Sequence, residues 1–587
     1  FGHNYIRFFK DEGQITSGGS VYEISTTYTA AQISEIEYVQ SADVLYLVHD
    51  NHKPRKLSRT GHTSWSISDV DFFDGPYDAA NTSSTTLTPS GTSGSVTVTA
   101  SSSVFVANDV GRSVRIKHSS TWGFGIITAF GSATSVTVAV NADRNYGGTG
   151  AVTDWRLGTF YTGNFPTKIT FFEERLFYAG TTQQPSTVFG SMSADFDKFS
   201  PTSVDGSVND DNGLSFTLVS DQVNQITGMY GGKFLHIFTK NGAFNMSSGS
   251  ATQGITPTTV QVTNETNDGA ADKKVSPASK SVLFIGKNKK RLREFAYNID
   301  YDSFTTPDMT VLSEHVGFGG FEECSFANYP NNILWVRRGD GVLLGFTYYR
   351  DQDVTAWHRH TIAGTNAKVK SIAVIPGVDD AFDTLYLIIE RTINSATTQY
   401  VEFLEEDYRV DDGLTKDDQF FVDSGLTYSG SSTSTLTGLN HLEGQTVAVL
   451  NNGAVEANKT VSSGAITLTN ATTKCHVGLP FTAELESVNV EPKSQYGTTQ
   501  GKRGRIDKVI FRLFETVGLK AGPASSSVDV VPFRTTTSTM SATEPKTGDY
   551  TFLMPATYTT ENKLYVKSDT AQACTISAIM IQMSTYS

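Results

Sequence analysis

The chain has 587 residues, of which 38% are hydrophobic, 11% are aromatic and only 18% are charged. This length predicts roughly three or four domains, and a low charge with many Thr, Val, Phe and Tyr residues favours strands over helices. The 46 basic and 60 acidic residues give a net charge of −14, which argues against a protein that grips nucleic acid through a basic surface.

A short strand pattern recurs along the chain. Each copy is a Leu followed by an aromatic residue or His, an apolar residue and a turn, with further strands expected on either side. The central leucines are Leu45, Leu176, Leu235, Leu283, Leu334 and Leu385. Their separations are 131, 59, 48, 51 and 51 residues, and a period of roughly 50 residues is typical of propeller blades with three or four antiparallel strands. We therefore predict a mainly β protein with a propeller-like arrangement of antiparallel β modules; a series of β-sandwiches is the alternative.

Two stretches rich in Ser, Thr and Gly, at about 73–157 and 412–486, do not carry this repeat. Both alternate polar and apolar residues over short lengths, which predicts small inserted β domains. Aspartates around the start of the second stretch, such as Asp417 and Asp418, predict a solvated linker. The predicted domains are a propeller-like region (1–72 and 158–411), two inserted β domains (73–157 and 412–486) and a C-terminal β domain (487–587).

Few residues point to chemistry. The sequence has no phosphate-binding loop, HExxH motif or GxSxG elbow, and no helix is expected after the glycine-rich run 317–320 to bind phosphate. His358 and His360 fall on one face of a strand, which a metal site could use, but without a third ligand a polar strand edge is favoured. The acidic loop 205–213 lacks EF-hand spacing and predicts a turn. Glu173–Glu174 predict a solvated hairpin turn, although two carboxylates at glycosidase distance are not ruled out by sequence.

Cysteines and basic clusters also favour structural roles. Cys324, Cys475 and Cys574 lie far apart with no CxxC pair, so we expect free thiols rather than a disulfide framework or a zinc site. The short basic clusters 287–293 and 502–505 are expected to be solvated turns. We predict no catalytic, cofactor-binding or metal-binding residue, no cofactor, and no membrane segment, because no apolar run reaches roughly 18 residues. Since the first residue is Phe rather than Met, we expect a processed or incomplete chain.

Several segments together resemble a known family, the nozzle or tail tubular protein B type of short-tailed bacteriophages and related prophages. They cover most of the propeller-like region and neither inserted stretch. In chain order they are YIRFFKDEGQI (5–15), VQSADVLYL (39–47), PRKL (54–57), ERLFYAGTTQQPSTVFGSMSADFDKFS (174–200), LVSDQVNQITGMYGGKFLHIFTKNGAF (218–244), AY (296–297), PDMT (307–310), EH (314–315) and AWHRHT (356–361), with a looser match around 508–514.

The resemblance implies a non-enzymatic virion protein of the tail, assembled in the bacterial cytoplasm. Six copies would form a ring below the portal and a tail tubular protein A-like adaptor, surround the DNA ejection channel and support tail fibres or spikes. An acidic balance suits a conduit through which genomic DNA slides without specific binding. The alternatives are a tail-borne depolymerase and a carbohydrate-binding module acting on host surface glycans; for binding, Trp122 and Trp155 are the aromatic candidates in the first inserted domain.

Overall fold

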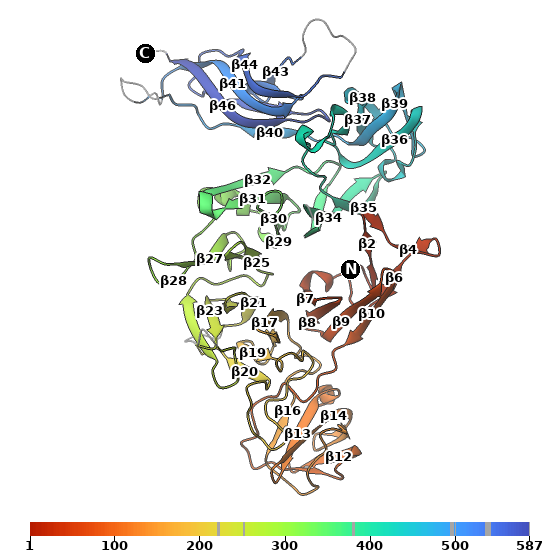
Figure 1. Ribbon diagram of the computed structural model, residues 1–587, viewed down its shortest axis with the longest axis vertical. Coiled ribbons are helices and arrows are strands. Elements are labelled where there is room, and N and C mark those ends of the chain that lie inside the picture. Colours follow the sequence, from red (N-terminus) through yellow and green to blue (C-terminus); the bar gives the residue numbers. More distant parts are fainter. Residues whose placement is uncertain are drawn as a thin grey trace. The chain divides into compact units, whose positions relative to one another are not determined.

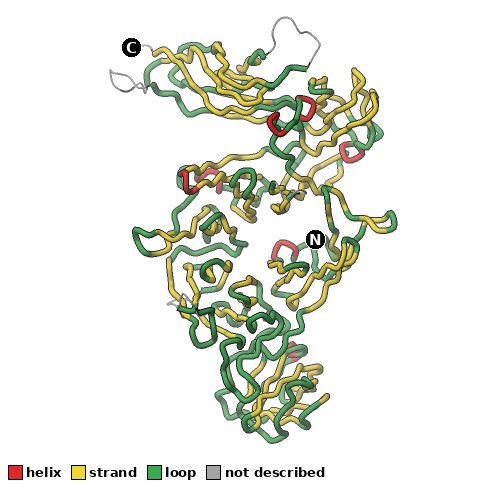
Figure 2. The backbone as a smooth tube through the Cα atoms, in the orientation of Figure 1, coloured by secondary structure: helices red, strands yellow, loops and turns green. Residues whose placement is uncertain are grey.

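The computed structural model describes residues 1–219, 224–249, 253–377, 382–492, 498, 501–533 and 542–585. Within these residues the protein is almost wholly β (Figure 1), and the helices are 3-10 turns of three or four residues, drawn red in Figure 2. This confirms the predicted mainly β fold class. No described helix has the length and apolar character needed to cross a membrane. The 3-10 helices are η1 (Ile33–Glu35), η2 (Ala107–Asp109), η3 (Glu314–Gly317), η4 (Arg350–Gln352), η5 (Val410–Asp412), η6 (Lys416–Asp418) and η7 (Asn440–Leu442).

Six antiparallel sheets follow one another along the chain, and in each the strands pair in chain order. We call these sheets meanders 1 to 6. The chain divides into two compact units, 1–324 and 325–587, and meanders 1 to 4 belong to the first. Their strands are β7 (Glu37–Ser41), β8 (Val44–His49), β9 (His52–Gly61) and β10 (Ser64–Asp69); β17 (Lys168–Phe172), β18 (Arg175–Ala179), β19 (Thr187–Gly190) and β20 (Leu214–Thr217); β21 (Ile226–Gly231), β22 (Leu235–Thr239), β23 (Gly242–Ser247) and β24 (Gln261–Thr266); and β25 (Ser276–Ala278), β26 (Ser281–Ile285), β27 (Leu292–Asn298) and β28 (Ser303–Thr305).

Meanders 5 and 6 belong to the second unit, apart from the first residues of β29. Meander 5 contains β29 (Phe321–Ala327), β30 (Ile333–Arg338), β31 (Leu343–Tyr349) and β32 (Val354–His360); meander 6 contains β33 (Lys368–Pro376), β34 (Asp383–Ile393) and β35 (Ala396–Phe403). All six central leucines of the sequence repeat lie on the second strand of a meander. The repeat therefore marks one strand position in each successive sheet.

Neighbouring meanders of the first unit share hydrophobic cores. Tyr46 of meander 1 packs in one cluster with Tyr178 of meander 2, and Phe177 of meander 2 packs with Leu235 of meander 3. A third cluster joins meanders 3 and 4. Because the second strands are covered on both faces, every residue of β18, β22 and β26 is buried. This face-to-face succession of sheets is the packing found between propeller blades.

A buried ion cluster joins the first strands of these meanders. Strand β17 contacts both β7 and β21, and Lys168 at its start lies 2.6 Å from Glu37 of β7 and 2.7 Å from Asp272, which precedes β25. Burial lowers the pKa of Lys168, but the two carboxylates outweigh it and raise the pKa above its ordinary value. The lysine therefore stays charged and holds meanders 1, 2 and 4 together.

Three two-stranded hairpins precede meander 1 and pack on it through Ile6, Phe8 and Tyr28. The ring of Phe8 stacks on Trp65 of β10 with centroids 4.2 Å apart. The hairpin strands, which pair β1 with β6, β2 with β3 and β4 with β5, are β1 (Tyr5–Arg7), β2 (Phe9–Lys10), β3 (Gly13–Gln14), β4 (Thr16–Ser17), β5 (Ser20–Val21) and β6 (Glu23–Ser25).

The first inserted stretch folds into a six-stranded sheet between meanders 1 and 2, drawn in orange in Figure 1. Val98, Ile116, Val138 and other buried residues of the stretch form one core of their own. The strand order is β11-β12-β15-β14-β13-β16. The strands are β11 (Leu87–Pro89), β12 (Gly94–Ala100), β13 (Ser113–His118), β14 (Thr121–Ser132), β15 (Ser135–Val140) and β16 (Trp155–Leu157).

The second inserted stretch forms a four-stranded sheet that follows meander 6, and two more sheets follow it. In the four-stranded sheet, of order β36-β39-β37-β38, the strands are β36 (Asp423–Leu436), β37 (Thr446–Asn451), β38 (Ala454–Thr460) and β39 (Ile466–Leu479). The C-terminal sheets, of orders β40-β45-β42-β43 and β44-β41-β46, contain β40 (Ala483–Glu486), β41 (Gly504–Thr516), β42 (Lys520–Ala524), β43 (Ser527–Val530), β44 (Lys546–Leu553), β45 (Tyr565–Ser568) and β46 (Thr575–Thr585). The domain boundaries predicted from sequence stay predictions.

The solvated linker expected at Asp417 and Asp418 is wrong for these two residues, which are half-buried. Lys474 of β39 pairs with Asp418. Burial alone would raise the pKa of Asp418, but its bonds to Lys474 and Thr415 lower the pKa to about 2. The segment is packed because Gln419, which follows, is fully buried and accepts a 2.8 Å hydrogen bond from the backbone of Ala573.

Candidate functional site

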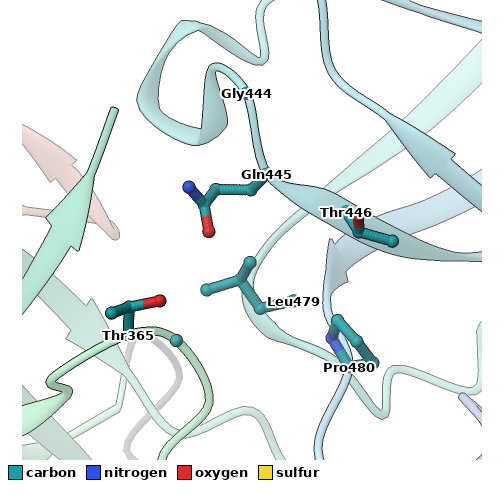
Figure 3. Close-up of a pocket in the computed structure, with 7 residues that line it drawn as sticks. Thr365, Gly444, Gln445, Thr446, Leu479 and Pro480 are labelled. Carbon is teal, nitrogen blue, oxygen red and sulfur yellow. The ribbon is translucent and has the colours of Figure 1, made fainter. Parts of the chain in front are cut away.

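A polar cavity of about 380 Å³ lies in the second unit, between the segment that precedes meander 6 and the second inserted sheet. In Figure 3 the side chains of Thr365 and Gln445 extend toward each other, with Leu479 between them. Thr446 and Pro480 lie farther along the same wall. The pocket is shallow and open to solvent, unlike the enclosed and mostly apolar sites that bind small molecules.

Buried charges fix one rim of this cavity. The Arg391 side chain on β34 is fully buried and donates from Nε to the carbonyl oxygen of Ala363 at 2.7 Å. The backbone N–H of Ala363 donates to Asp423 Oδ2 at 2.5 Å. Gly364, which follows, has φ +109°, and a Cβ there would lie 2.8 Å from Arg391 Cδ. Only glycine therefore fits between the rim and the arginine.

The cavity offers hydrogen bonds but no titratable lining side chain: it is lined by Gly364, Thr365, Gly444, Gln445, Thr446, Leu479 and Pro480. Two carboxylates lie behind the rim. Glu402 accepts from Arg391 Nη2 at 3.0 Å, and burial raises the pKa of Asp423 to about 6 against the opposing effects of Ala363 and Arg391. Since neither lines the cavity, these acids hold the wall rather than face a ligand.

His358 and His360 lie on one face of β32, as the sequence predicts, and bond to each other. His358 Nδ1 and His360 Nε2 are 2.8 Å apart, and the edges of both rings meet Trp335. Burial lowers the pKa of both rings, that of His360 to about 4. The facing nitrogens are already used in this bond, and no third ligand joins them among the described residues. The two histidines therefore form a polar pair on strand β32, at the edge of meander 5.

The acidic loop 205–213 is held by a cation of the chain itself. The buried Arg175 guanidinium donates to the carbonyl oxygens of Ser191, Asp210 and Asn212 at 2.6, 2.6 and 2.7 Å. These carbonyl oxygens therefore already accept hydrogen bonds from an arginine of the chain. Glu173–Glu174 form the exposed turn between β17 and β18, where both residues have positive φ, and Glu173 Oε2 accepts from the backbone of Ile255 at 2.6 Å.

The basic cluster 287–293 spans the hairpin between β26 and β27 and the start of β27, and three of its five cations pair with carboxylates. Its ion pairs are Lys289 with Glu322, Arg291 with Asp308 and Glu314, and Arg293 with Asp268. In the second cluster, Arg505 pairs with Asp507. The paired cations, Lys289, Arg291, Arg293 and Arg505, therefore bind neighbouring carboxylates and are not available for phosphates.

The remaining candidates lie in the interior. Cys324, Cys475 and Cys574 are free thiols, and burial raises their pKa values to about 12, 12 and 11. Trp122 and Trp155 are each only 9% exposed, so they offer no aromatic surface for a glycan. Gly317 ends η3, and strand β29, rather than a helix, follows the glycine-rich run 317–320.

Sequence reasoning did not find the residues of the cavity. Thr365, Gln445 and Leu479 are far apart in the chain, and threonine, glutamine and leucine carry no spacing signal.

No family model and no curated protein matches this chain. Among solved structures, AztD of Citrobacter koseri is 8% identical over 67% of this chain and 98% of its own, with a TM-score of 0.25. A luciferin-regenerating enzyme is 11% identical over 64% and 94%, with a TM-score of 0.23. The exo-beta-1,3-galactanase of Phanerochaete chrysosporium is 11% identical over 71% and 95%, with a TM-score of 0.21. These similarities are too low to bear on the fold or the activity.

Proposed function

We propose that the chain is a structural subunit of the tail nozzle of a short-tailed bacteriophage. Six copies form a ring around the DNA ejection channel, below a tail tubular protein A-like adaptor, and support tail fibres or spikes. The proposal rests on the long ordered segments that resemble the nozzle or tail tubular protein B family.

The observation that carries the proposal is the place of these segments in the fold. The segment 174–200 covers β18 and β19, and 356–361 covers most of β32. The segment 218–244 covers β21, β22 and the start of β23, with 220–223 outside the described residues. The two long segments, 174–200 and 218–244, therefore lie in the meander scaffold on mostly buried strands, as suits a shared architecture rather than a shared reaction. The shorter segment on β32 is more exposed.

Charge supports the same proposal. The net charge is −14, and the cations of cluster 287–293 that pair with carboxylates are unavailable for phosphates. A channel wall of this kind repels DNA weakly and lets it slide. We expect binding of the purified chain to duplex DNA to be weak at physiological salt; nanomolar affinity in a filter assay would instead indicate a nucleic-acid-binding protein.

Electron cryomicroscopy of virions that carry this chain tests the proposal. Identical subunits close a ring by repeating one heterologous interface, so we expect six copies around the tail axis, with a bore wide enough for a duplex of about 20 Å. A monomer in solution is compatible with this, because the adaptor ring can act as a template. A map that places the chain off the axis, as a trimeric fibre or spike, contradicts the proposal.

A further inference from the structure

A buried histidine in meander 1 lies between two carboxylates. His49 is the last residue of β8, Glu35 ends η1, and Asp50 begins the turn to β9. His49 Nε2 is 3.3 Å from Glu35 Oε2, and Nδ1 on the other side of the ring is 2.9 Å from Asp50 Oδ1. The histidine side chain is 0% exposed, whereas those of Glu35 and Asp50 are 66% and 51% exposed. The cluster therefore consists of one buried imidazole and two solvent-exposed carboxylates.

The ring nitrogen that faces Glu35 has no hydrogen-bond partner. His49 Nε2 is buried and makes no hydrogen bond despite its 3.3 Å distance to the carboxylate, while Nδ1 accepts a 3.1 Å hydrogen bond from the backbone N–H of Asn51. A buried polar atom without a partner is costly, roughly 1–3 kcal/mol in proteins. A cation bound between this nitrogen and the Glu35 carboxylate would interact favourably with both.

Each neutral form of the ring leaves one nitrogen lone pair beside a carboxylate oxygen. With the proton on Nδ1, the Nε2 lone pair faces the Glu35 carboxylate. With the proton on Nε2, Nε2–H faces Glu35, and the Nδ1 lone pair accepts from the Asn51 N–H but also lies 2.9 Å from Asp50 Oδ1. A neutral imidazole carries one proton and so leaves one lone pair opposed to a negative oxygen. A cation between Nε2 and Glu35 requires the proton to be on Nδ1, which then donates to Asp50 Oδ1 at 2.9 Å and no longer accepts from the Asn51 N–H.

The distances suit a transition metal. Zinc binds histidine nitrogen and carboxylate oxygen at about 2.0–2.2 Å, so ligands around a tetrahedral ion lie about 3.3–3.5 Å apart, close to the 3.3 Å between Nε2 and Glu35 Oε2. One potential ligand atom from each of the three residues lies within 4.8 Å of the others. The neighbouring His52 is not needed, because its ring bonds to Thr27 and Gln32.

We propose that His49 Nε2 and Glu35 bind one divalent ion of the zinc type, with Asp50 orienting the ring through Nδ1–H. Such a carboxylate–histidine–metal arrangement fixes the tautomer and strengthens the nitrogen as a ligand. The exposed acids leave the remaining coordination positions to water, and the site lies at the end of β8, an inner strand of meander 1. It does not depend on the proposed nozzle function.

Calorimetric titration of the untagged chain with Zn²⁺ tests the site. We expect one ion per chain with micromolar affinity and a higher melting temperature in the presence of Zn²⁺. Glu35→Gln, at an exposed position that leaves the fold intact, should weaken binding more than 100-fold. Asp50→Asn should weaken it about 10- to 100-fold, as orienting residues do. Glu12→Gln, an exposed acid of the same unit, is the matched control and should bind like the parent.

Two results would overturn the proposal. One is the absence of both heat and thermal stabilisation up to 1 mM Zn²⁺, about a thousandfold above the expected micromolar range, which would leave a proton as the cation between the acids. The other is equal affinity in Glu35→Gln and Glu12→Gln, which would place the bound ion elsewhere. X-ray absorption at the zinc edge, showing one nitrogen ligand with otherwise oxygen ligands, supports the assignment to His49.

Discussion

The two inserted sheets have a similar composition but differ in where their hydrophobic cores lie. The first keeps its core within its own strands and docks on meander 2 by polar contacts, such as Arg115 Nη2 to Thr202 Oγ1 at 2.9 Å. The second shares its core with Ala363, which precedes meander 6. A second cluster joins Leu450 of its sheet to Ala571 of the C-terminal region. Composition predicts a small β domain in both places, but only the position of the core decides whether such a domain is independent.

Deletion of each sheet should have the largest effect and separate the two cases. Removing 79–156 and joining Asp78 to Leu157 through two glycines should leave a soluble, folded chain, because Asp78 N already bonds to Leu157 O at 2.9 Å. This cut lies inside the predicted 73–157 boundaries, since Phe73 bonds to Asp197 of meander 2. Removing 425–478 should abolish cooperative unfolding of the second unit, because apolar partners on both sides become exposed. Soluble yield and calorimetric melting measure both.

The comparison fails if the two deletions behave alike. A soluble chain lacking 425–478 that melts like the parent would show that the shared clusters contribute little. An insoluble chain lacking 79–156 would show that the polar contacts of the first sheet are essential to meander 2.

Arg391→Met should have the next largest effect, because this fully buried arginine ties meander 6 to Ala363 and pairs with Glu402. Removing one partner of a buried pair leaves an uncompensated charge and costs about 3–5 kcal/mol. Urea unfolding followed by tryptophan fluorescence measures the loss. Arg512→Met, which breaks the exposed pair with Asp549 in the same unit, is the matched control and should not change the midpoint measurably. Equal midpoints for the two variants would contradict the assigned role of Arg391.

Asp423→Asn should stabilise the second unit at neutral pH. Burial raises the pKa of Asp423 to about 6 in the folded chain, from 3.8 ordinarily, so the folded state holds the proton more tightly. Its contribution to stability is complete below about pH 4 and is lost as the pH rises through 6. The loss is about 3 kcal/mol at most, at about 1.4 kcal/mol per pKa unit.

Unfolding free energies at pH 4, 5, 6 and 7.5 check this prediction. The parent should lose stability relative to Asp423→Asn as the pH rises from 4 to 7.5, because asparagine still accepts from Ala363 without a charge. A difference between the two proteins that does not change with pH would show that Asp423 is ionised throughout this range in the folded chain.

Thr202→Val should have the smallest effect. The effect should be limited to the contact between the first inserted sheet and meander 2. The change removes the hydroxyl that accepts from Arg115, while the Thr202 carbonyl oxygen, 3.2 Å from Nη2, remains. The loss of one such bond costs about 1 kcal/mol. Hydrogen exchange of the Trp122 amide, which donates to Val204 at 2.8 Å, should accelerate while global unfolding is unchanged. A lower global midpoint would show that the first sheet and meander 2 unfold together.

The local sequence pattern predicts the strand content and the succession of sheets. The recurring Leu and aromatic residues predicted the second strand of every meander, because a strand covered on both faces is mostly apolar, as β26 is after Ser281. It also determined that His358 and His360 share a face, since residues two apart on a strand point the same way.

The tertiary structure alone decided which polar residues meet. Glu35 and His49 come from different elements, and neither the cavity at Thr365 and Gln445 nor the pairing of Arg391 with Glu402 follows from a spacing in the chain. Such contacts depend on how whole sheets pack, and packing is set by many small apolar contacts summed over distant segments rather than by local periodicity. For the same reason the independence of the first inserted sheet, and the dependence of the second, appear only when the cores are seen.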